Sequence, residues 1–165
     1  MPTLAKYEVA LHTKFPLAWA GTLWSWLNEP RAPNFDDFSP KTKAQFMVEL
    51  GLRVTREITW AIHYDDRIVG YLAFKPMNPI FGQFHGLVID PEFRGRGIGT
   101  EAFTAALTEL IEQGFKSFLV MPYADNLPIL KVIRNVGFRE SGRILHATER
   151  DGDPVNLRVM TRGAD

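Results

Sequence analysis

The sequence contains no cysteine, carries no net charge and has no long apolar run, and each absence excludes a class of function. Without a thiol, the chain forms no disulfide, no thiolate metal site and no covalent acyl-cysteine intermediate. Its 19 Lys and Arg residues balance 19 Asp and Glu residues, so the charge favours neither nucleic acid nor an acidic membrane as a partner. No apolar run approaches the roughly 18 residues of a membrane-spanning helix. We therefore expect a cytoplasmic protein that binds no metal, no membrane and no nucleic acid.

One domain over residues 1–165 is the simplest organisation, because a chain of this length that is 45% hydrophobic can bury a core. Helical spacing predicts a first helix within Pro16–Leu27. The N-cap and first-turn proline pair Ser39-Pro40 predicts a second helix, which runs to about Leu50 and stops at Gly51. The proline-rich stretch 29–40 between these helices contains no motif that indicates its role.

From residue 57 onward, period-2 alternation and short apolar runs predict six strands: 58–64, 68–74, 83–89, 118–121, 142–149 and 155–160. The first two and the last two strands form hairpins. A stripe of apolar residues predicts a helix from Ile98 to Gly114, and Asn126 caps a last helix that Gly137 closes. The strand at 118–121 follows the first of these helices, so it is expected to pair parallel to strand 83–89 through a right-handed crossover. The fold class is therefore α/β.

The segment Asp90–Glu101 carries the clearest sign of chemistry, because its glycines alternate between a predicted strand and a predicted helix. Glycine backbone can approach a ligand closely, and its N–H groups can point into one concavity beside a helix N-terminus. Two arginines and a threonine hydroxyl add to this phosphate cradle. Its residues are Arg94, Gly95, Arg96, Gly97, Ile98, Gly99 and Thr100. The alternative is a tight turn whose glycines only permit positive φ.

Two common nucleotide motifs do not fit this segment. A dinucleotide-binding Rossmann unit places its glycines after the first strand and an acidic residue at the end of the next strand. Here an antiparallel hairpin comes first, and Met121-Pro122-Tyr123 stands where the acid belongs. A Walker A loop requires a lysine before its Ser or Thr, whereas Gly99 precedes Thr100.

The run Arg94-Gly95-Arg96-Gly97-Ile98-Gly99 matches the Arg/Gln-x-x-Gly-x-Gly/Ala signature of the GCN5-related N-acetyltransferases (GNAT), and the chain resembles that family. The segment Leu87–Phe93 is similar to the family's fourth strand and the turn after it. Asn126, followed eleven residues later by Gly137-Phe138, resembles a later family segment. The resemblance covers about residues 58–160, whereas residues 1–57 correspond to the region that helps choose the acceptor in such enzymes.

The resemblance implies a mixed central sheet with a V-shaped cofactor cleft between two parallel strands, flanked by about four helices. It also implies acetyl-CoA as the cosubstrate. The pyrophosphate would rest on the amides of Arg94 through Thr100, and the pantetheine arm would lie where strands 83–89 and 118–121 separate. A backbone N–H of Leu87, Val88 or Ile89 would polarise the thioester carbonyl. Asn126 would contact the cofactor arm, a role compatible with its alternative as a helix N-cap.

Acetyl transfer to an amine needs a neutral nucleophile, so a His or a carboxylate must accept a proton. Family members often carry a His or Glu as the base on the strand that meets the thioester, which makes His85 the favoured candidate here. Period-2 alternation places His85 on the same face as Leu87 and Ile89. Glu49 is a weaker candidate. The alternatives are a hydrogen-bonded structural histidine and a solvated carboxylate on a helix face.

One position departs from the family pattern, because Ile133 stands where members commonly have a tyrosine that protonates the leaving thiolate. Tyr123 and Ser141 are other conceivable donors. The sequence therefore predicts an N-acetyltransferase that acts on a primary amine of a small molecule or peptide by direct attack in a ternary complex. The alternative is a non-catalytic module that binds or senses coenzyme A or acyl-CoA. The closing hairpin offers edge strands through which a homodimer could form.

Overall fold

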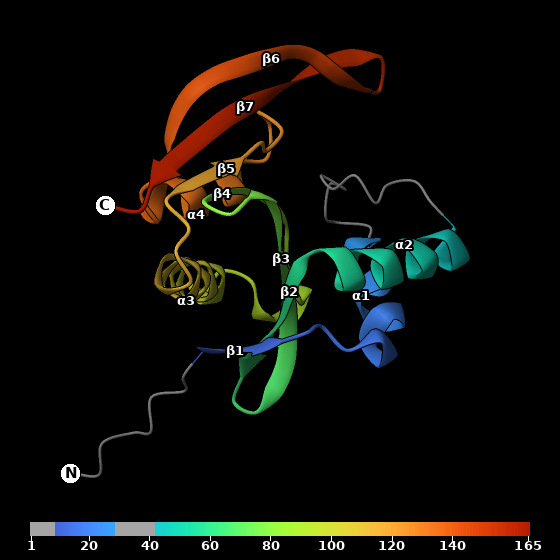
Figure 1. Cartoon of the computed structure of the whole chain (residues 1–165). Coiled ribbons are helices and arrows are strands. Elements are labelled where there is room, and N and C mark those ends of the chain that lie inside the picture. The colour runs from blue at the N-terminus through green and yellow to red at the C-terminus, as the bar shows by residue number, and fades with distance from the viewer. Residues whose placement is uncertain (1–8, 29–41) are drawn as a thin grey trace, which may run out of the picture.

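The computed structural model describes residues 9–28 and 42–165, which form a mixed seven-stranded sheet with helices on both faces (Figure 1). The elements are β1 (Val9–Thr13), α1 (Ala20–Leu27), α2 (Lys43–Arg56), β2 (Ile58–Tyr64), β3 (Arg67–Asn78), β4 (Phe81–Ile89), α3 (Ile98–Glu112), β5 (Ser117–Val120), α4 (Leu127–Asn135), β6 (Arg139–Arg150) and β7 (Asp153–Gly163). The strand order is β1-β2-β3-β4-β5-β7-β6. None of the described helices has the length and apolarity of a membrane span.

The predicted α/β class and all six predicted strands are confirmed, and β1 adds a strand that the sequence did not predict. The predicted stop of the second helix at Gly51 is wrong, since α2 runs on to Arg56. Its buried stripe of Phe46, Leu50 and Val54 continues across the glycine. This packing outweighs the cost of about 1 kcal/mol of an interior glycine. Thr42 caps α2, and the predicted start at Ser39-Pro40 lies outside the described residues.

Two buried clusters hold the helices on opposite faces of the sheet, as Figure 1 shows for α3 and α4 on one side and α1 and α2 on the other. The cluster under α3 and α4 is rich in phenylalanine, with Phe84 and Phe103 ring centroids 4.2 Å apart. The cluster under α1 and α2 contains Trp26, Phe46 and Tyr71. Both faces of the central strands are therefore apolar, as expected for a sheet covered on two sides.

β4 and β5 form the one parallel pair of strands among the described residues, and their ladder is short. It ends at the pair Gln83 and Leu119, although β4 continues beside β3 as far as Ile89. After β5 the chain follows β7 instead, where the Arg158 N–H donates to the Pro122 carbonyl over 2.9 Å. The two parallel strands therefore separate beyond Gln83, as the V-shaped arrangement requires. We call this point the β4–β5 fork.

The neighbouring histidines of β1 and β2 make stability depend on pH. The rings of His12 and His63 lie 4.1 Å apart, and burial, reinforced by His12, lowers the pKa of His63 while Asp66 partly opposes the shift. The unfolded chain therefore binds a proton at His63 before the folded chain does, so folding stability falls as pH drops below about 6.5. We expect His63→Gln to lose less stability than the wild type between about pH 7.5 and pH 5. Urea unfolding across this range measures the difference, and parallel pH curves for the two proteins would contradict it.

Candidate functional site

The glycine loop after β4 has the conformation that a phosphate cradle needs. Gly95 and Gly97 adopt φ values of +76° and +79°, and Gly97 is the N-cap of α3. A Cβ atom built at either glycine would meet no other atom within 4 Å. Residues 94–97 are exposed. The positive φ values alone would suit a tight turn, but the open space beside both glycines also lets a ligand approach the backbone.

Side chains and amides around this loop favour an anion. The Arg94 Nε–H donates to the Ile89 carbonyl over 3.0 Å, and the Arg96 guanidinium donates to the Glu92 carbonyl over 3.3 Å. Both arginines are thus held by backbone next to the start of α3. The amides of residues 98–100 lie in the first turn of this helix, where N–H groups have no acceptor within the helix. Positive charge and aligned amides at a helix N-terminus favour an anion such as a phosphate.

The helix end of the cradle packs against the stretch of β4 that lies beyond the β4–β5 fork. A Cβ atom at Gly99 would stand 3.5 Å from a methyl group of Leu87 and 3.7 Å from one of Val132. Leu87 belongs to the part of β4 beyond the fork, and Val132 belongs to α4. The first turn of α3 therefore packs between these two elements. A ligand whose anionic part rests on the loop can extend from there along the free stretch of β4.

A β-bulge in β4 alters which residues face each side of the sheet. Ala73 pairs with Gly86 and Phe74 pairs with Phe84, so His85 is an extra residue without a direct partner on β3. Before the bulge, the even-numbered Phe84 faces the cluster under α3 and α4. After the bulge, the odd-numbered Leu87 and Ile89 face the same cluster. Val88 belongs to the cluster under α1 and α2.

The prediction that His85 shares a face with Leu87 and Ile89 is therefore wrong. His85 instead contacts Glu57 and Arg53 at the end of α2. The bulge is the physical reason, because one extra residue shifts the alternation of side chains by one position. His85 still lies two residues beyond the last β4 residue that pairs with β5, and so remains at the fork.

Three polar side chains meet at the bulge. His85 Nδ1 lies 3.3 Å from Glu57 Oε1, and Arg53 Nε lies 3.7 Å from Glu57 Oε2. An Arg53 N–H also donates to the His85 carbonyl oxygen over 3.4 Å. The exposed fractions of the side chains are 8% for Glu57, 11% for Arg53 and 25% for His85. Of the three, His85 has the largest part of its side chain accessible to a substrate.

Sequence reasoning did not find Glu57 or Arg53. Glu57 is the residue between α2 and β2, and no spacing rule connects it to His85, which lies 28 positions later. Glu49, the second predicted base, is half-buried on α2 one turn before Arg53. Residues four apart share a helix face, so Glu49 lies on the side of α2 that presents Arg53.

The later predicted residues lie on α4 and beyond β5. Asn126 is the N-cap of α4, and its side chain accepts a hydrogen bond from the Ile129 N–H over 3.3 Å, which confirms its capping role. Ile133 is fully buried in the cluster under α3 and α4. Tyr123 forms a bridge with β7 on the β5 side of the fork, and Arg150 lies 5.0 Å from its ring centroid.

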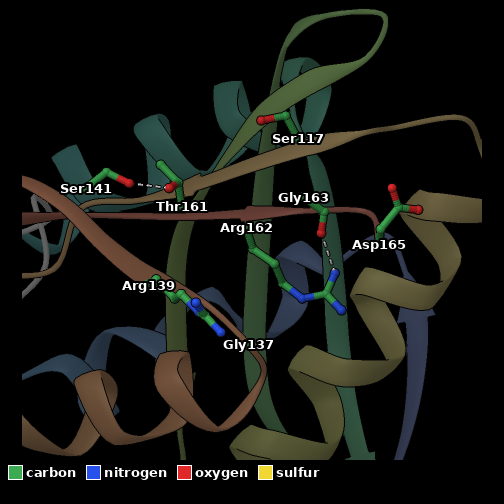
Figure 2. A pocket seen from close by; sticks show the side chains of 8 residues that line it. All are labelled: Ser117, Gly137, Arg139, Ser141, Thr161, Arg162, Gly163 and Asp165. Carbon is green, nitrogen blue, oxygen red and sulfur yellow. Dashed lines mark hydrogen bonds between the residues drawn. The ribbon is translucent and has the colours of Figure 1, made fainter.

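A polar hollow of about 600 Å³ lies elsewhere, at the end of the sheet where β5 begins and β7 ends (Figure 2). Its lining residues are Ser117, Gly137, Arg139, Ser141, Thr161, Arg162, Gly163 and Asp165. Ser141 bonds to Thr161 there, and β7 separates its strand from β5. Ser141 is therefore separated from β5 by one strand and from β4 by two strands, and we do not assign the hollow to the same site.

Comparison with known proteins links these features to one family. A model described as "Acetyltransferase (GNAT) family" matches residues 20–138. A mycothiol acetyltransferase of Corynebacterium aurimucosum is 33% identical over 61 residues, which are 37% of this chain and 20% of that protein. A mycothiol acetyltransferase of Saccharomonospora viridis is 28% identical over 118 residues, covering 62% of this chain and 38% of that protein. The chain spans between about a fifth and about half of the length of the curated relatives it matches.

Solved structures share the fold at low sequence identity. The Salmonella typhimurium acetyltransferase that modifies the N-terminal serine of ribosomal protein L7/L12 has a TM-score of 0.81 at 17% identity, over 95% of both chains. The Salmonella typhimurium protein yncA, solved with its cofactor acetyl-CoA, has a TM-score of 0.73 at 12% identity, over 98% of this chain and 95% of that chain. At these identities the likeness shows the fold alone.

We expect Arg53 to stabilise the β4 bulge that contains His85. Replacing it with methionine removes the ion pair to a carboxylate that is 8% exposed. Breaking such a pair leaves a buried charge uncompensated, so we expect Arg53→Met to lower the free energy of unfolding by about 3 kcal/mol. Arg56→Met, at an exposed position three residues later, serves as the control and should change stability by less than about 0.5 kcal/mol. Chemical denaturation measures both, and equal effects would contradict a special role of Arg53.

Proposed function

The chain belongs to the GNAT family of acetyltransferases, and from that premise we propose that it transfers an acetyl group from acetyl-CoA to a primary amine of a small molecule or peptide. The attack is direct, within a ternary complex of protein, acetyl-CoA and amine. The observation that carries the proposal is the position of an open glycine cradle beside the stretch of β4 beyond the β4–β5 fork. This arrangement can hold an extended ligand with a diphosphate at one end and a reactive group at the other.

The residues of the cradle suit the diphosphate of acetyl-CoA. The amides of Arg94 through Thr100 would bind its oxygens, because Gly95 and Gly97 leave space for them and α3 begins at this point. Arg94 and Arg96, held beside the loop by their bonds to backbone carbonyls, supply positive charge. Asn126, at the start of α4, would contact the pantetheine arm while it caps its helix.

When bound, acetyl-CoA supplies an activated thioester, whose acetyl group the amine attacks. Beyond the fork, the edge of β4 at Leu87, Val88 and Ile89 is not covered by β5. A backbone N–H on this edge would donate to the thioester carbonyl oxygen as negative charge develops there. Loss of such a donor typically lowers kcat by about 100-fold or more. Orientation of the two reactants contributes the larger part, about 7 to 11 kcal/mol.

His85 would act as the general base from the α1 and α2 side of the fork. It accepts the proton of the incoming ammonium, directly or through a water, so that the neutral amine can attack. Its partly exposed ring and its position two residues beyond Gln83 support this role. Glu49 is the weaker candidate, since its half-buried carboxylate lies on the face of α2 that carries Arg53.

The leaving thiolate does not receive its proton from position 133, because the Ile133 side chain is buried and has no donor. Water is the proton source that we propose. A coenzyme A thiolate can leave without an enzymic acid, so this absence need not abolish turnover. The buried Ile133 is also the observation behind the second candidate function, a non-catalytic module that binds coenzyme A or acyl-CoA.

Binding and turnover separate these two functions. Both predict that acetyl-CoA raises the melting temperature, because a ligand that binds only the folded state stabilises it. Only the enzyme releases free coenzyme A thiol faster when an amine is added. We expect this increase for at least one member of a panel of polyamines, amino acids, aminoglycosides and peptide N-termini. Stabilisation without amine-dependent thiol release would favour the module, and neither effect would contradict both functions.

Gly97→Ala is expected to weaken acetyl-CoA binding about tenfold, which corresponds to about 1.4 kcal/mol. The methyl group would enter the open space beside the loop, and the positive φ would disfavour the native amide geometry. Gly152→Ala is the matched control, because Gly152 has a φ of +83° and equally open surroundings in the β6–β7 turn. Calorimetric titration measures both affinities. Equal losses in the two variants would show that backbone strain, rather than the cradle, is responsible.

His85→Ala is expected to lower kcat by about 100-fold or more, the usual contribution of a general base. Cofactor affinity should change little, because the cradle lies on the other side of the sheet from the His85 side chain. Rates measured across pH check the assignment. An unchanged pH–rate profile in the variant would dismiss His85 as the base.

A further inference from the structure

We propose that Glu57 is a positioning residue that holds the His85 ring in the tautomer with its proton on Nδ1, so that Nε2 is the atom that accepts the proton of the amine. The inference rests on the proposed function and adds a residue that neither the motif nor the family comparison indicates. It is carried by the 3.3 Å distance between Glu57 Oε1 and His85 Nδ1, and by the burial of Nδ1 and of the Glu57 side chain.

The position of Glu57 is energetically unfavourable for a carboxylate. Its side chain is only 8% exposed, and removing a carboxylate from water is costly. It is also the C-cap residue of α2, where the helix dipole disfavours negative charge. Arg53 compensates one oxygen, and His85 faces the other. Each oxygen therefore faces one partner, which favours a single orientation of the carboxylate.

This orientation determines the tautomer of His85. An ionised carboxylate only accepts hydrogen bonds, so it favours the tautomer that has the proton on the ring nitrogen facing it. His85 Nδ1 is buried, and the 25% of the side chain that remains exposed therefore lies on its other atoms. With the proton on Nδ1, the lone pair is on Nε2. When Nε2 takes a proton from the ammonium, the nitrogen–hydrogen bond of the amine breaks, its electron pair stays on the amine, and the carboxylate stabilises the imidazolium.

Arg53 completes the arrangement by holding both partners. It pairs with Glu57 Oε2 at 3.7 Å and donates to the His85 carbonyl oxygen over 3.4 Å. The carboxylate and the backbone of the bulge are thus fixed by one guanidinium. Arg53 also determines how the side-chain amide of a glutamine at position 57 would be oriented, because the amide oxygen would face the Arg53 donor. The glutamine NH₂ group would then face Nδ1 and impose the opposite tautomer.

The first experiment measures the tautomer directly, with ¹⁵N NMR of the histidine side chains at about pH 9, where a histidine that titrates near about 6.5 is neutral. The His85 signals are assigned by their loss in His85→Ala. We expect an Nδ1–H ring in the wild type, an Nε2–H ring in Glu57→Gln, and a retained Nδ1–H ring in Glu57→Asp, which keeps an acceptor-only carboxylate. An Nε2–H ring in the wild type would overturn the proposal.

The second experiment measures kcat and both KM values in a double-mutant cycle. Glu57→Gln should lower kcat by about 100-fold or more with KM values within about twofold, because only proton transfer is affected. In the His85→Ala background the same substitution should cause no further loss, and Glu57→Asp should restore part of kcat in the His85 background. An equal loss in both backgrounds would show a structural role and overturn the proposal.

Glu149→Gln is the matched control. Glu149 Oε1 lies 2.8 Å from His146 Nε2, but both side chains are about 60% exposed on the β6–β7 hairpin. This substitution should leave kcat unchanged. The wild-type tautomer is measured without any variant at position 57, so the proposal stays testable if Glu57→Gln fails to fold. A wild type with the Nδ1–H ring but no amine-dependent turnover would refute the proposed function while leaving the Glu57 contact established.

Discussion

The parallel ladder between β4 and β5 ends at Gln83 and Leu119, and the rest of the site depends on this early separation. Because β5 then follows β7, the last six residues of β4 keep β3 as their neighbour on one edge and have no strand of β5 on the other. Backbone N–H groups at a sheet interior are normally paired, so an edge in the middle of a sheet is a place where a ligand can replace a strand. The glycine loop and α3 follow directly after the end of this edge, so the proposed anion site and the strand edge are neighbours.

The bulge at His85 turns this side chain towards α2, the side of the sheet from which we propose that the amine approaches. The side chains of Leu87 and Ile89 pack towards α3 and α4, whereas His85 points to the end of α2. A cofactor on the cradle and an acceptor near α2 would therefore approach the same stretch of β4 from opposite faces of the sheet. This geometry suits direct transfer, because neither reactant must leave before the other binds. The contacts of Arg53 connect α2 to the bulge.

Much of this could be predicted from the sequence, and the failures have physical causes. Local rules succeeded where a residue's role depends on its neighbours in the chain. The predicted hairpin of β2 and β3 forms, with Asp65 and Asp66 at positive φ in its turn, and Asn126 caps α4 as predicted. They failed where tertiary contacts decide. The buried stripe of α2 stabilises the helix beyond Gly51. A bulge in β4 shifts the alternation of side chains, so that His85 lies on the opposite face from the predicted one. Glu57 could not be identified because its burial depends on an element from another part of the chain.

The central claim is that the cradle and the fork together bind one cofactor. Backbone amide chemical shifts, followed by NMR while coenzyme A is added, test it residue by residue. We predict that the largest shifts fall on residues 94–100 and 87–89, with smaller ones at the start of α4. Shifts centred on the hollow around Arg139 and Arg162, with the glycine loop unaffected, would contradict the account.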